Sequence, residues 1–244
     1  MKRTLVVGGA NGIGLSIATL IASRQECDKV YIVDKSPIDD AMCNPKFEYH
    51  CFDLTSKDYS LFHKFNDIDS LIITAGFGHL SLFKEVSEPY ILDSFLVNSV
   101  APIRIIHHFM DKLMSNDTFY CGVMVSIAGF MSSPFFAVYG ATKAALKIFI
   151  ESVNVELEKA GSINRILNIS PGSIAGTSFN NAKTDLSVTR PLAEEIIQHL
   201  EAHDDLFIPR YEEIFREVLE RYHTDFREEG RHSYDYKLNS GRVK

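Results

Sequence analysis

Residues 124–146 read MVSIAGFMSSPFFAVYGATKAAL. Small and apolar side chains recur at helical spacing between positions 141 and 153, which predicts a helix over residues 137–159. On that helix Tyr139 and Lys143 lie one turn apart on the same face. A phenol titrates near pH ~10 in water, so it is a poor acid or base at neutral pH unless a cation stabilises the phenolate. Lys143 can supply that cation, and the pair therefore indicates proton-transfer chemistry.

Ser126 stands directly after an apolar run, Tyr120–Val125, which predicts a buried strand. Its hydroxyl is therefore expected at the carboxyl end of a sheet, the edge at which open α/β sheets bind ligands. The chain contains ten tyrosines, so Tyr139 and Lys143 could be ordinary surface residues if this pattern stood alone.

The amino terminus carries a second motif. A short β-branched run, Thr4–Val7, is followed by a glycine-rich turn and by an amphipathic segment, residues 15–23, that predicts a helix. A strand, a glycine turn and a helix amino terminus form a cradle for a pyrophosphate, because the backbone N–H groups and the helix dipole face the anion. The residues expected to bind it are Gly8, Asn11, Gly12, Ile13 and Gly14.

The serine, the Tyr-x-x-x-Lys helix and the glycine spacing together resemble the classical short-chain dehydrogenase/reductase family over residues 3–209. The resemblance implies an α/β fold, a Rossmann-like doubly wound and mostly parallel seven-stranded sheet with helices on both faces. The chain has 244 residues and is 45% hydrophobic, a size that commonly forms one domain, so we expect a single NAD(P)-binding domain over residues 1–244. Residues 210–244 leave the family pattern and are expected to form an extra helix, residues 211–229, and a polar tail.

The resemblance also implies four catalytic residues, Asn98, Ser126, Tyr139 and Lys143. Tyr139 would give or take the hydroxyl proton, and Ser126 would hydrogen-bond the substrate oxygen. Lys143 would lower the pKa of the tyrosine and bind the nicotinamide ribose. Asn98 lies in a helical region predicted over residues 89–114 and would support the proton relay; the alternative is an ordinary solvated helix asparagine.

Asp34 bears on the choice of cofactor. It ends the second predicted strand, residues 29–33, and a carboxylate there accepts hydrogen bonds from the ribose hydroxyls and repels a 2′-phosphate. NAD is therefore favoured over NADP, although Lys35 could partly accommodate that phosphate. Alternatively, Asp34 caps the turn before Ser36 and Pro37.

Further cofactor contacts are implied by the resemblance at the ends of the other predicted strands. Asp53 follows the predicted strand Phe47–Cys51 and would contact the adenine amino group, or it could cap a helix beginning at Thr55. The remaining contacts are expected at Tyr139 and Lys143 and at Leu54, Ala75, Gly76, Pro171, Gly172, Ile174 and Thr177.

Some positions depart from the family pattern. Val7 stands where the family has a threonine, and Ile73 and Thr74 replace two asparagines. Thr177 comes one residue later than usual because Gly176 intervenes. The last elements predicted are strands over residues 70–74, 163–169 and 206–209 and a helix over residues 191–202.

Composition limits the partners. The net charge of −7 and the pI near 5.7 argue against nucleic acid or an anionic membrane, which need a basic surface. The four cysteines, Cys27, Cys43, Cys51 and Cys121, form no Cys-x-x-Cys pair, so we expect no metal site and mostly buried, reduced thiols. Glycines interrupt the apolar run near the amino terminus, and no run approaches the ~20 residues that span a bilayer, so a cytoplasmic location is expected.

The predicted reaction is hydride transfer between a nicotinamide cofactor and a carbonyl or secondary alcohol. A non-catalytic NAD(P)-sensing protein of the same fold is the alternative from another functional class. Aromatic side chains near the predicted site would suit a lipophilic or aromatic ketone, and polar ones would suit a sugar-like or polyol-like substrate, which we favour. The alternative for Lys183 and Arg190 is that they are solvated loop charges. These side chains are Phe77, His79, Phe130, Phe135, Phe136 and Phe179, with Ser132, Asn180, Asn181, Lys183 and Arg190.

The helices that carry Asn98 and Tyr139 contain more apolar residues than one sheet face needs. In the resembled family these two helices pair across a subunit interface, so a homotetramer or dimer is expected. The side chains that suggested this are Phe109, Met110, Met114, Phe149 and Val153.

Overall fold

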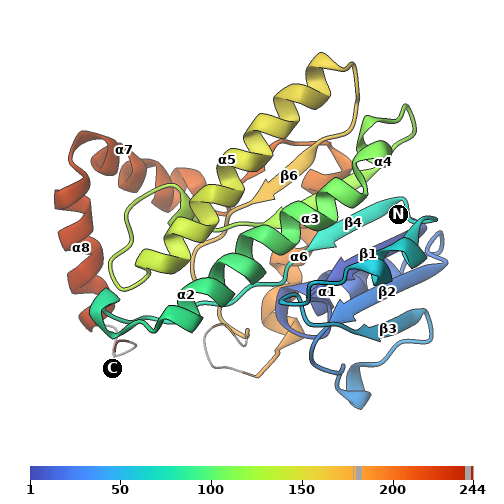
Figure 1. Cartoon of the computed structure of the whole chain (residues 1–244), viewed down its shortest axis with the longest axis horizontal. Helices are drawn as coiled ribbons and strands as arrows, with labels where there is room; N and C mark the ends of the chain where they lie inside the picture. The colour runs from blue at the N-terminus through green and yellow to red at the C-terminus, as the bar shows by residue number, and fades with distance from the viewer. Residues whose placement is uncertain (178, 180–182, 240–242, 244) are drawn as a thin grey trace.

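The computed structural model describes residues 1–177, 179, 183–239 and 243. Its centre is a seven-stranded sheet in the order β3-β2-β1-β4-β5-β6-β7, in which every neighbouring pair is parallel. The strands are β1 (Arg3–Val7), β2 (Lys29–Asp34), β3 (Phe47–Cys51), β4 (Ser70–Ile73), β5 (Tyr120–Met124), β6 (Ile166–Ile169) and β7 (Leu206–Phe207). The predicted doubly wound sheet is confirmed, and it is parallel throughout (Figure 1).

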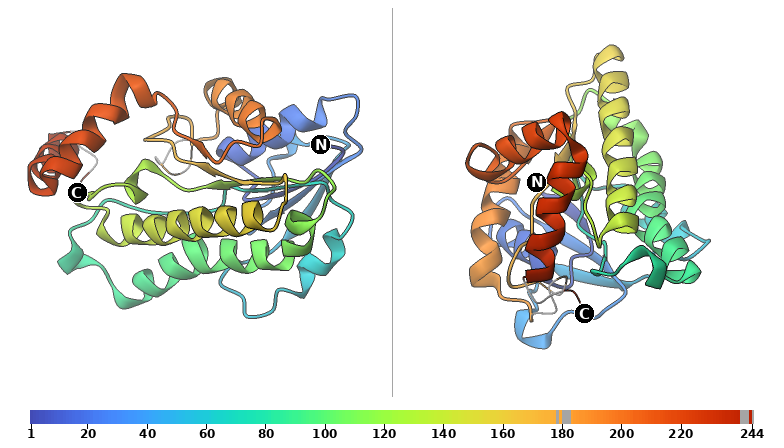
Figure 2. Two further views of the ribbon diagram at one scale, coloured as in Figure 1. Left: turned by 90° about the horizontal axis from the view of Figure 1, so that it is seen from above. Right: turned by 90° about the vertical axis from the view of Figure 1, so that its left-hand side faces the viewer.

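Helices cover both faces of the sheet (Figure 2). They are α1 (Gly12–Ala22), α2 (Glu88–Phe95), α3 (Ala101–His108), α4 (Met110–Met114), α5 (Ala137–Lys159), α6 (Leu186–Glu201), α7 (Arg216–Thr224) and α8 (Phe226–Asn239). α1 and α6 share one apolar core with the sheet, and α3 and α5 share the other. α7 and α8 lie beyond the carboxyl ends of the strands, beside the amino-terminal end of α5 (Figure 1).

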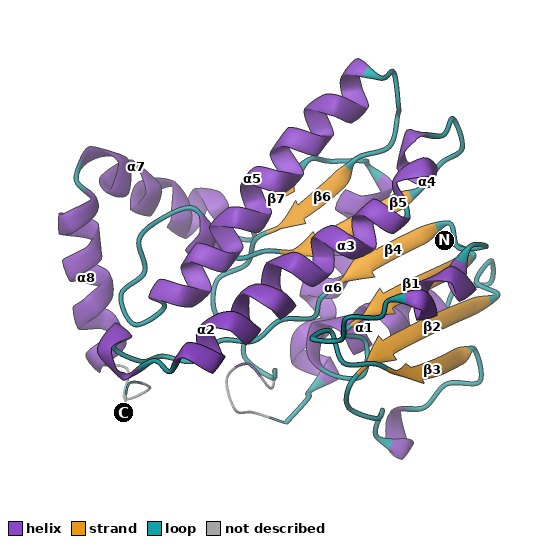
Figure 3. Ribbon diagram, viewed as in Figure 1, coloured by secondary structure: helices purple, strands orange, loops and turns teal. Residues whose placement is uncertain are grey.

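Alternate residues of the central strands enter the two cores, as expected for a parallel sheet covered on both faces. In β1, Leu5 and Val7 face the core of α3 and α5, whereas Val6 faces the core of α1 and α6. In β4, Leu71 and Ile72 divide in the same way, and all five side chains are at most 1% exposed. The loops at the carboxyl edge therefore stand on a rigid frame (Figure 3).

The helical region predicted over residues 89–114 is interrupted. α2 passes into a π-helical turn, Leu96–Val100, before α3 begins. Proline has no backbone N–H, so Pro102 cannot donate to the carbonyl four residues earlier, which belongs to Asn98. The Ala101 N–H instead bonds the carbonyl of Leu96, five residues back, which is the π-helical pattern.

The extra helix predicted over residues 211–229 is divided, and the polar tail predicted after it was wrong. A π-helical turn, Tyr211–Phe215, precedes α7, and the predicted polar tail is helical through Asn239 in α8. The break between the two helices falls at Asp225, whose backbone is extended and whose Oδ1 accepts the Arg227 N–H at 2.8 Å. This carboxylate satisfies a free donor of the first turn of α8, so the helix restarts there.

Other bounds are closer to expectation. The helix over residues 137–159 and the strand over residues 47–51 are as predicted. α6 begins five residues early, at Leu186, because Asp185 accepts hydrogen bonds from the Ser187 N–H and hydroxyl. β6 is shorter than predicted because Asn164 turns its side chain to the backbone of the preceding β5 region, accepting the Phe119 N–H at 2.8 Å.

The four cysteines are free, but only Cys27 and Cys121 are buried. Cys43 follows a short turn and Cys51 ends the edge strand β3, so both are exposed, contrary to the expectation of mostly buried thiols. Among the described residues, none of the helices combines the length and the apolar character that crossing a bilayer requires.

Candidate active site

Ser126 and Tyr139 meet at the carboxyl edge of β5. Gly129 allows this approach, since a Cβ there would lie 2.8 Å from the backbone carbonyl of Lys143 in α5. Ser126 accepts the Ala128 N–H at 3.1 Å, and a hydrogen bond between the Ser126 and Tyr139 side chains lowers the pKa of the phenol. Burial has the larger effect and raises the pKa of Tyr139 to about 12. The structure therefore keeps the phenol protonated.

Lys143 is almost completely enclosed, with 2% of its surface exposed. Its Nζ donates to the carbonyl of Met124 at 2.9 Å and lies 5.7 Å from the centre of the Tyr139 ring. Burial lowers the pKa of Lys143 to about 7. Desolvation drives both groups toward their neutral forms, and the predicted lowering of the tyrosine pKa by Lys143 stays a prediction.

Asn98 is fully buried in the π-helical turn, so the alternative of a solvated helix asparagine is wrong. Its Oδ1 accepts the Phe77 N–H at 2.9 Å, and its Nδ2 donates to the Phe77 carbonyl at 2.8 Å and to the Thr142 hydroxyl at 3.2 Å. Asn98 thus ties the loop after β4 to α5. π-Helical turns often mark functional sites, and here the turn aims this amide at the loop.

Gly76 lies between two of these side chains. A Cβ on Gly76 would lie 3.2 Å from Asn98 Oδ1 and 3.3 Å from Lys143 Nζ. Any side chain at Gly76 would crowd the amide of Asn98 and the amino group of Lys143. The four predicted catalytic residues are therefore gathered around one loop, although their roles remain predictions.

The glycine turn after β1 packs too closely for side chains. Gly8 has a φ of +84°, and a Cβ on it would lie 2.5 Å from the Ala75 nitrogen. A Cβ on Gly14 would overlap the carbonyl of Gly8 and the hydroxyl of Thr74. Thr74, which replaces one of the family's asparagines, donates to the Gly8 carbonyl at 3.0 Å and so links the turn to the loop after β4.

Gly12 opens toward the segment before α6. Its N–H donates to the Thr184 hydroxyl at 3.0 Å, and a Cβ on Gly12 would meet only the Thr177 side chain, at 3.6 Å. Asn11 precedes α1 and Ile13 lies in its first turn. A glycine-rich turn at the amino terminus of a helix fits a dinucleotide pyrophosphate.

Asp34 faces this turn from the end of β2. Its Oδ2 accepts the Ala10 N–H and its Oδ1 accepts the Ser36 N–H, each at 3.1 Å. The carboxylate therefore caps its own turn and also braces the glycine turn. Lys35 is exposed beside it.

Asp53 and Leu54 follow β3. Asp53 Oδ1 accepts hydrogen bonds from the Thr55 N–H and hydroxyl, both at 2.8 Å, and these bonds lower the pKa of the carboxyl. The chain makes a turn here, so the alternative of a helix beginning at Thr55 is wrong. Leu54 packs against the core of α3 and α5.

The segment after β6 lies beside the serine loop. The Pro171 carbonyl accepts the Ile127 N–H at 3.1 Å, and Thr177 donates to the Ile174 carbonyl at 3.0 Å. A Cβ on Gly172 would lie 2.8 Å from the Phe215 ring, so the carboxyl-terminal segment also reaches this place. The structure brings this segment, the glycine turn and the serine loop to one edge of the sheet.

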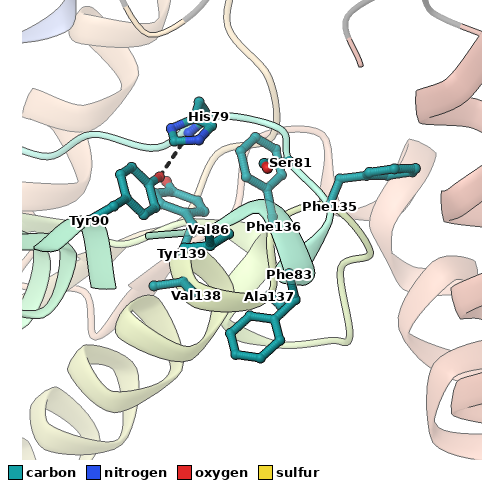
Figure 4. Close-up of a pocket in the computed structure, with 10 residues that line it drawn as sticks. All are labelled: His79, Ser81, Phe83, Val86, Tyr90, Phe135, Phe136, Ala137, Val138 and Tyr139. Carbon is teal, nitrogen blue, oxygen red and sulfur yellow. Dashed lines mark hydrogen bonds between the residues drawn. The ribbon is translucent and has the colours of Figure 1, made fainter. Parts of the chain in front are cut away.

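A small pocket opens at Tyr139 (Figure 4). Tyr90 accepts the His79 N–H at 3.1 Å through its hydroxyl, which lies beside Tyr139 (Figure 4). Sequence reasoning named His79, Phe135 and Phe136 but missed Tyr90. The only signal was the first turn of α2, capped by Ser87, with a tyrosine facing back toward the sheet edge. The lining side chains are His79, Ser81, Phe83, Val86, Tyr90, Phe135, Phe136, Ala137, Val138 and Tyr139.

The other aromatic residues and the serine named for substrate binding divide into those near the pocket and those away from it. Phe77 and Phe179 stay near the site, since the Phe77 ring lies 5.6 Å from Tyr90 and the Phe179 ring lies 5.3 Å from Tyr139. Phe130 and Ser132 do not line the pocket, because Phe130 packs under Lys147 and Ser132 bonds the carbonyl of Phe226.

The polar residues after β6 that suggested a sugar-like substrate give that substrate less support. Arg190 is paired with Glu194 at 2.8 Å on the exposed side of α6, so it is not aimed at the pocket. Lys183 is exposed, while Asn180 and Asn181 lie outside the described residues. In the part of the chain that the structure describes, no three His, Cys, Asp or Glu side chains gather as a metal site would require.

A family model described as short chain dehydrogenase matches residues 2–186. The chain belongs to the short-chain dehydrogenase family. It is similar to Dehydrogenase RED2 of Cochliobolus heterostrophus, with 28% identity over 169 residues, which cover 66% of this chain and 63% of that protein. The chain thus spans less than two thirds of that relative's length.

Solved structures show the same fold. A short chain dehydrogenase/reductase from Burkholderia phymatum, in complex with NAD, superposes with a TM-score of 0.76 at 17% identity and covers 92% of this chain and 93% of its own. A short chain dehydrogenase from Burkholderia cenocepacia, in complex with NADP, has a TM-score of 0.72 at 20% identity, with 91% and 99% coverage. At these identities the likeness concerns the fold.

Proposed function

We propose that this chain catalyses hydride transfer between a nicotinamide dinucleotide and a carbonyl or secondary alcohol. The observation that carries the proposal is the gathering of a buried phenol, a buried lysine, a serine hydroxyl and a buried amide around one loop at the carboxyl edge of the sheet. The phenol also lines a small pocket, and the turn after β1 leaves no room for side chains at Gly8 and Gly14. A sensor that only binds the dinucleotide has no need for a hydrogen bond between the phenol of Tyr139 and the hydroxyl of Ser126.

Residues at one edge of the sheet would hold the dinucleotide. Gly8, Gly12 and Gly14 would receive the pyrophosphate, and Asp34 would receive the adenosine ribose. Lys143 would reach the nicotinamide ribose, with Gly76 allowing the approach. When bound, the nicotinamide supplies or accepts the hydride.

Tyr139 would move the proton. In the reducing direction its O–H donates to the substrate oxygen as the carbonyl carbon gains a hydride, which leaves an alcohol and a tyrosinate; oxidation is the reverse. The high pKa of Tyr139 keeps its hydroxyl protonated and able to donate, and the Ser126 hydroxyl would orient the substrate oxygen. Lys143, with a pKa of about 7, can exchange a proton near neutral pH and return one to the tyrosinate. Asn98 would hold Phe77 and Thr142, and through them the loop and α5.

NAD is the proposed cofactor, because the Asp34 carboxylate would repel the 2′-phosphate of NADP. Its two oxygens already accept backbone N–H groups, so the negative charge is fixed beside the expected ribose. The solved structures with the same fold include one in complex with NADP and one in complex with NAD.

For the substrate, the pocket favours the alternative that was ranked second from the sequence. Its lining is mainly aromatic and aliphatic, with hydroxyls at Ser81 and Tyr90, and Arg190 is occupied by Glu194. We therefore propose a lipophilic or aromatic ketone, or the corresponding alcohol, and rank the sugar-like substrate below it.

A panel of carbonyls and alcohols, followed by nicotinamide absorbance, tests both levels of the proposal. Aryl ketones reduced with NADH at higher kcat/KM than sugars or sugar phosphates are the expected result. Preference for sugar phosphates would reverse the ranking, and turnover of none of them would favour the sensor.

We also propose a dimer or tetramer, although mostly not on the residues named first. Phe109 and Val153 are buried in the core, Met110 and Phe149 are half-buried, and only Met114 of the five is exposed. Exposed apolar side chains on α2, the π-helical turn and α5 form the better candidate surface, and light scattering at micromolar concentration should show more than one copy. They are Leu92, Phe95, Leu96, Val100, Ile148 and Val155.

A further inference from the structure

The carboxyl-terminal hairpin, residues 211–239, lies outside the segment that matches the family model. It comprises the π-helical turn, α7 and α8, and it stands at the carboxyl edge of the sheet next to the loop that leads into α5 (Figure 1, Figure 2). A buried carboxylate joins its two helices, because Glu229, 5% exposed, accepts the Arg221 Nε–H at 2.8 Å. The hairpin is thus a preformed unit.

Lys237 of α8 fastens this hairpin to the pocket. The residue is 8% exposed, and its Nζ donates to Ser133 Oγ at 2.6 Å, to the Pro134 carbonyl at 2.9 Å and to Ser233 Oγ at 3.0 Å. An ammonium that loses water needs such a full set of acceptors. Two of the three belong to the loop that carries the pocket wall.

The same ammonium lies 5.5 Å from the centre of the Phe136 ring. That ring lies 5.2 Å from the ring of Tyr139 and lines the pocket. A cation at this distance from an aromatic face is attracted to it. Lys237 is therefore linked to Tyr139 through a single side chain.

Tyr234, one turn before Lys237, holds the neighbouring wall residue. Its ring lies 4.6 Å from the ring of Phe135, which also lines the pocket. Phe135 has a φ of +65°, a conformation that side chains other than glycine rarely adopt. Its carbonyl accepts the Ser81 N–H at 3.0 Å on the other side of the pocket. A strained residue persists where its surroundings hold it, and here they do so from both sides.

At its other end the hairpin reaches the segment expected to lie at the nicotinamide. The Phe215 ring lies 2.8 Å from the position of a Cβ on Gly172. The hairpin therefore touches both sides of the site, at Gly172 and at Phe135 and Phe136.

We propose that the hairpin over residues 211–239 sets the size of substrate that the pocket accepts, with Lys237 and Tyr234 as positioning residues that hold Phe136 and Phe135. This inference rests on the proposed function and adds a determinant outside the family segment. Without the hairpin contacts, Phe135 leaves its strained conformation, Phe136 moves away from Tyr139, and the pocket admits bulkier carbonyls.

Two variants release the wall in different ways. Lys237→Met keeps the length of the side chain and removes its three hydrogen bonds, and Tyr234→Leu removes the ring that packs on Phe135. The matched control is Tyr236→Leu, the same substitution on the same helix at a side chain that is 69% exposed.

Amide hydrogen exchange tests, without any turnover, whether Lys237 and Tyr234 hold Phe136 and Phe135 in place. The Ser81 and Phe136 amides, which bond the Phe135 and Ser133 carbonyls, should exchange roughly tenfold faster in both variants. The sheet amide of Val125, which bonds the Ile169 carbonyl, should keep its rate, and Tyr236→Leu should leave all three unchanged. Unchanged exchange at Ser81 and Phe136 in Lys237→Met would overturn the inference.

Kinetics with cyclohexanone and benzophenone test selectivity. The ratio of kcat/KM for benzophenone to that for cyclohexanone should rise roughly tenfold in Lys237→Met and Tyr234→Leu, mainly through KM, and stay constant in Tyr236→Leu. Faster exchange with an unchanged ratio would reduce the hairpin to a structural support and refute its role in selectivity. If the unaltered protein reduces neither ketone nor any other carbonyl, the proposed function fails. Hydrogen exchange still shows whether Lys237 and Tyr234 hold Phe136 and Phe135.

Discussion

The glycine turn after β1 and the pocket at Tyr139 stand at the same edge of the sheet but are built by opposite means. The turn depends on absent side chains, since a Cβ on Gly8 or Gly14 would collide with the backbone. The pocket depends on side chains brought from several elements, among them Tyr90 of α2 and Tyr139 of α5, with His79 from the loop after β4. The proposed pyrophosphate site therefore depends mainly on one short segment, whereas the proposed catalytic site needs several elements to pack together.

The substitution Gly14→Ala tests most strongly whether the turn after β1 depends on the absence of side chains. The added methyl would overlap the Gly8 carbonyl and the Thr74 hydroxyl, so the turn has to open and dinucleotide affinity should fall about 100-fold. Fluorescence titration with NADH measures this. Gly230→Ala in α8 is the control, since a Cβ there would have its nearest contact at 3.6 Å, and normal NADH affinity of Gly14→Ala would contradict the account.

Asp34→Asn gives a smaller effect on the same region. The amide oxygen can still accept the Ala10 N–H, so the turn stays braced while the negative charge is lost. The preference for NADH over NADPH, measured as the ratio of kcat/KM values, should shrink about tenfold. Asp53→Asn, at the end of β3, is the control and should change the ratio less; an equal change in both variants would argue against a specific role of Asp34.

Lys143 gives a prediction about the stability of the fold, because its buried side chain changes protonation state on unfolding. Its folded pKa of about 7 lies below the ordinary value of 10.5, so between these pH values the unfolded chain binds a proton that the folded chain does not. The stability of the unaltered protein should rise with pH across this window, by at most about 1.4 kcal/mol per pH unit from this group. The cost of burying the ammonium is fully present below pH 7 and absent above pH 10.5.

Lys143→Met removes this dependence. Denaturant unfolding at several pH values should show the variant gaining less stability than the unaltered protein as the pH rises. Lys147→Met, one turn further along α5 beside Glu151, is the control and should keep the slope of the unaltered protein. Parallel curves for Lys143→Met and the unaltered protein would contradict the burial argument.

The sequence predicted the local features of both regions well. Strand periodicity and helical spacing located β3 and α5 to the residue, because each depends on near neighbours in the chain. The division of the region predicted as one helix over residues 89–114 was missed, although Pro102 in its interior lacks the N–H that a continuous helix needs and is visible in the sequence.

Features that depend on distant contacts were not predictable. Tyr90 becomes part of the pocket only when α2 is placed against α5, and Arg190 is lost from it when α6 begins at Leu186 and pairs that arginine with Glu194. The raised pKa of Tyr139 is likewise a result of burial, which no spacing of residues reveals. The hairpin over residues 211–239 has a polar sequence, and only its contacts with Phe135 and Phe136 show why it is ordered.

The most direct test of the account is Tyr139→Phe, measured by single-turnover reduction of an aryl ketone beside NADH titration. The ring remains in place against Phe136 and Phe179 while the transferable proton is removed. Turnover should fall by about 10²-fold or more, with NADH affinity within about twofold of the unaltered protein. A variant that keeps near-normal turnover, or that loses NADH binding together with turnover, would contradict the assignment of Tyr139 as the proton donor.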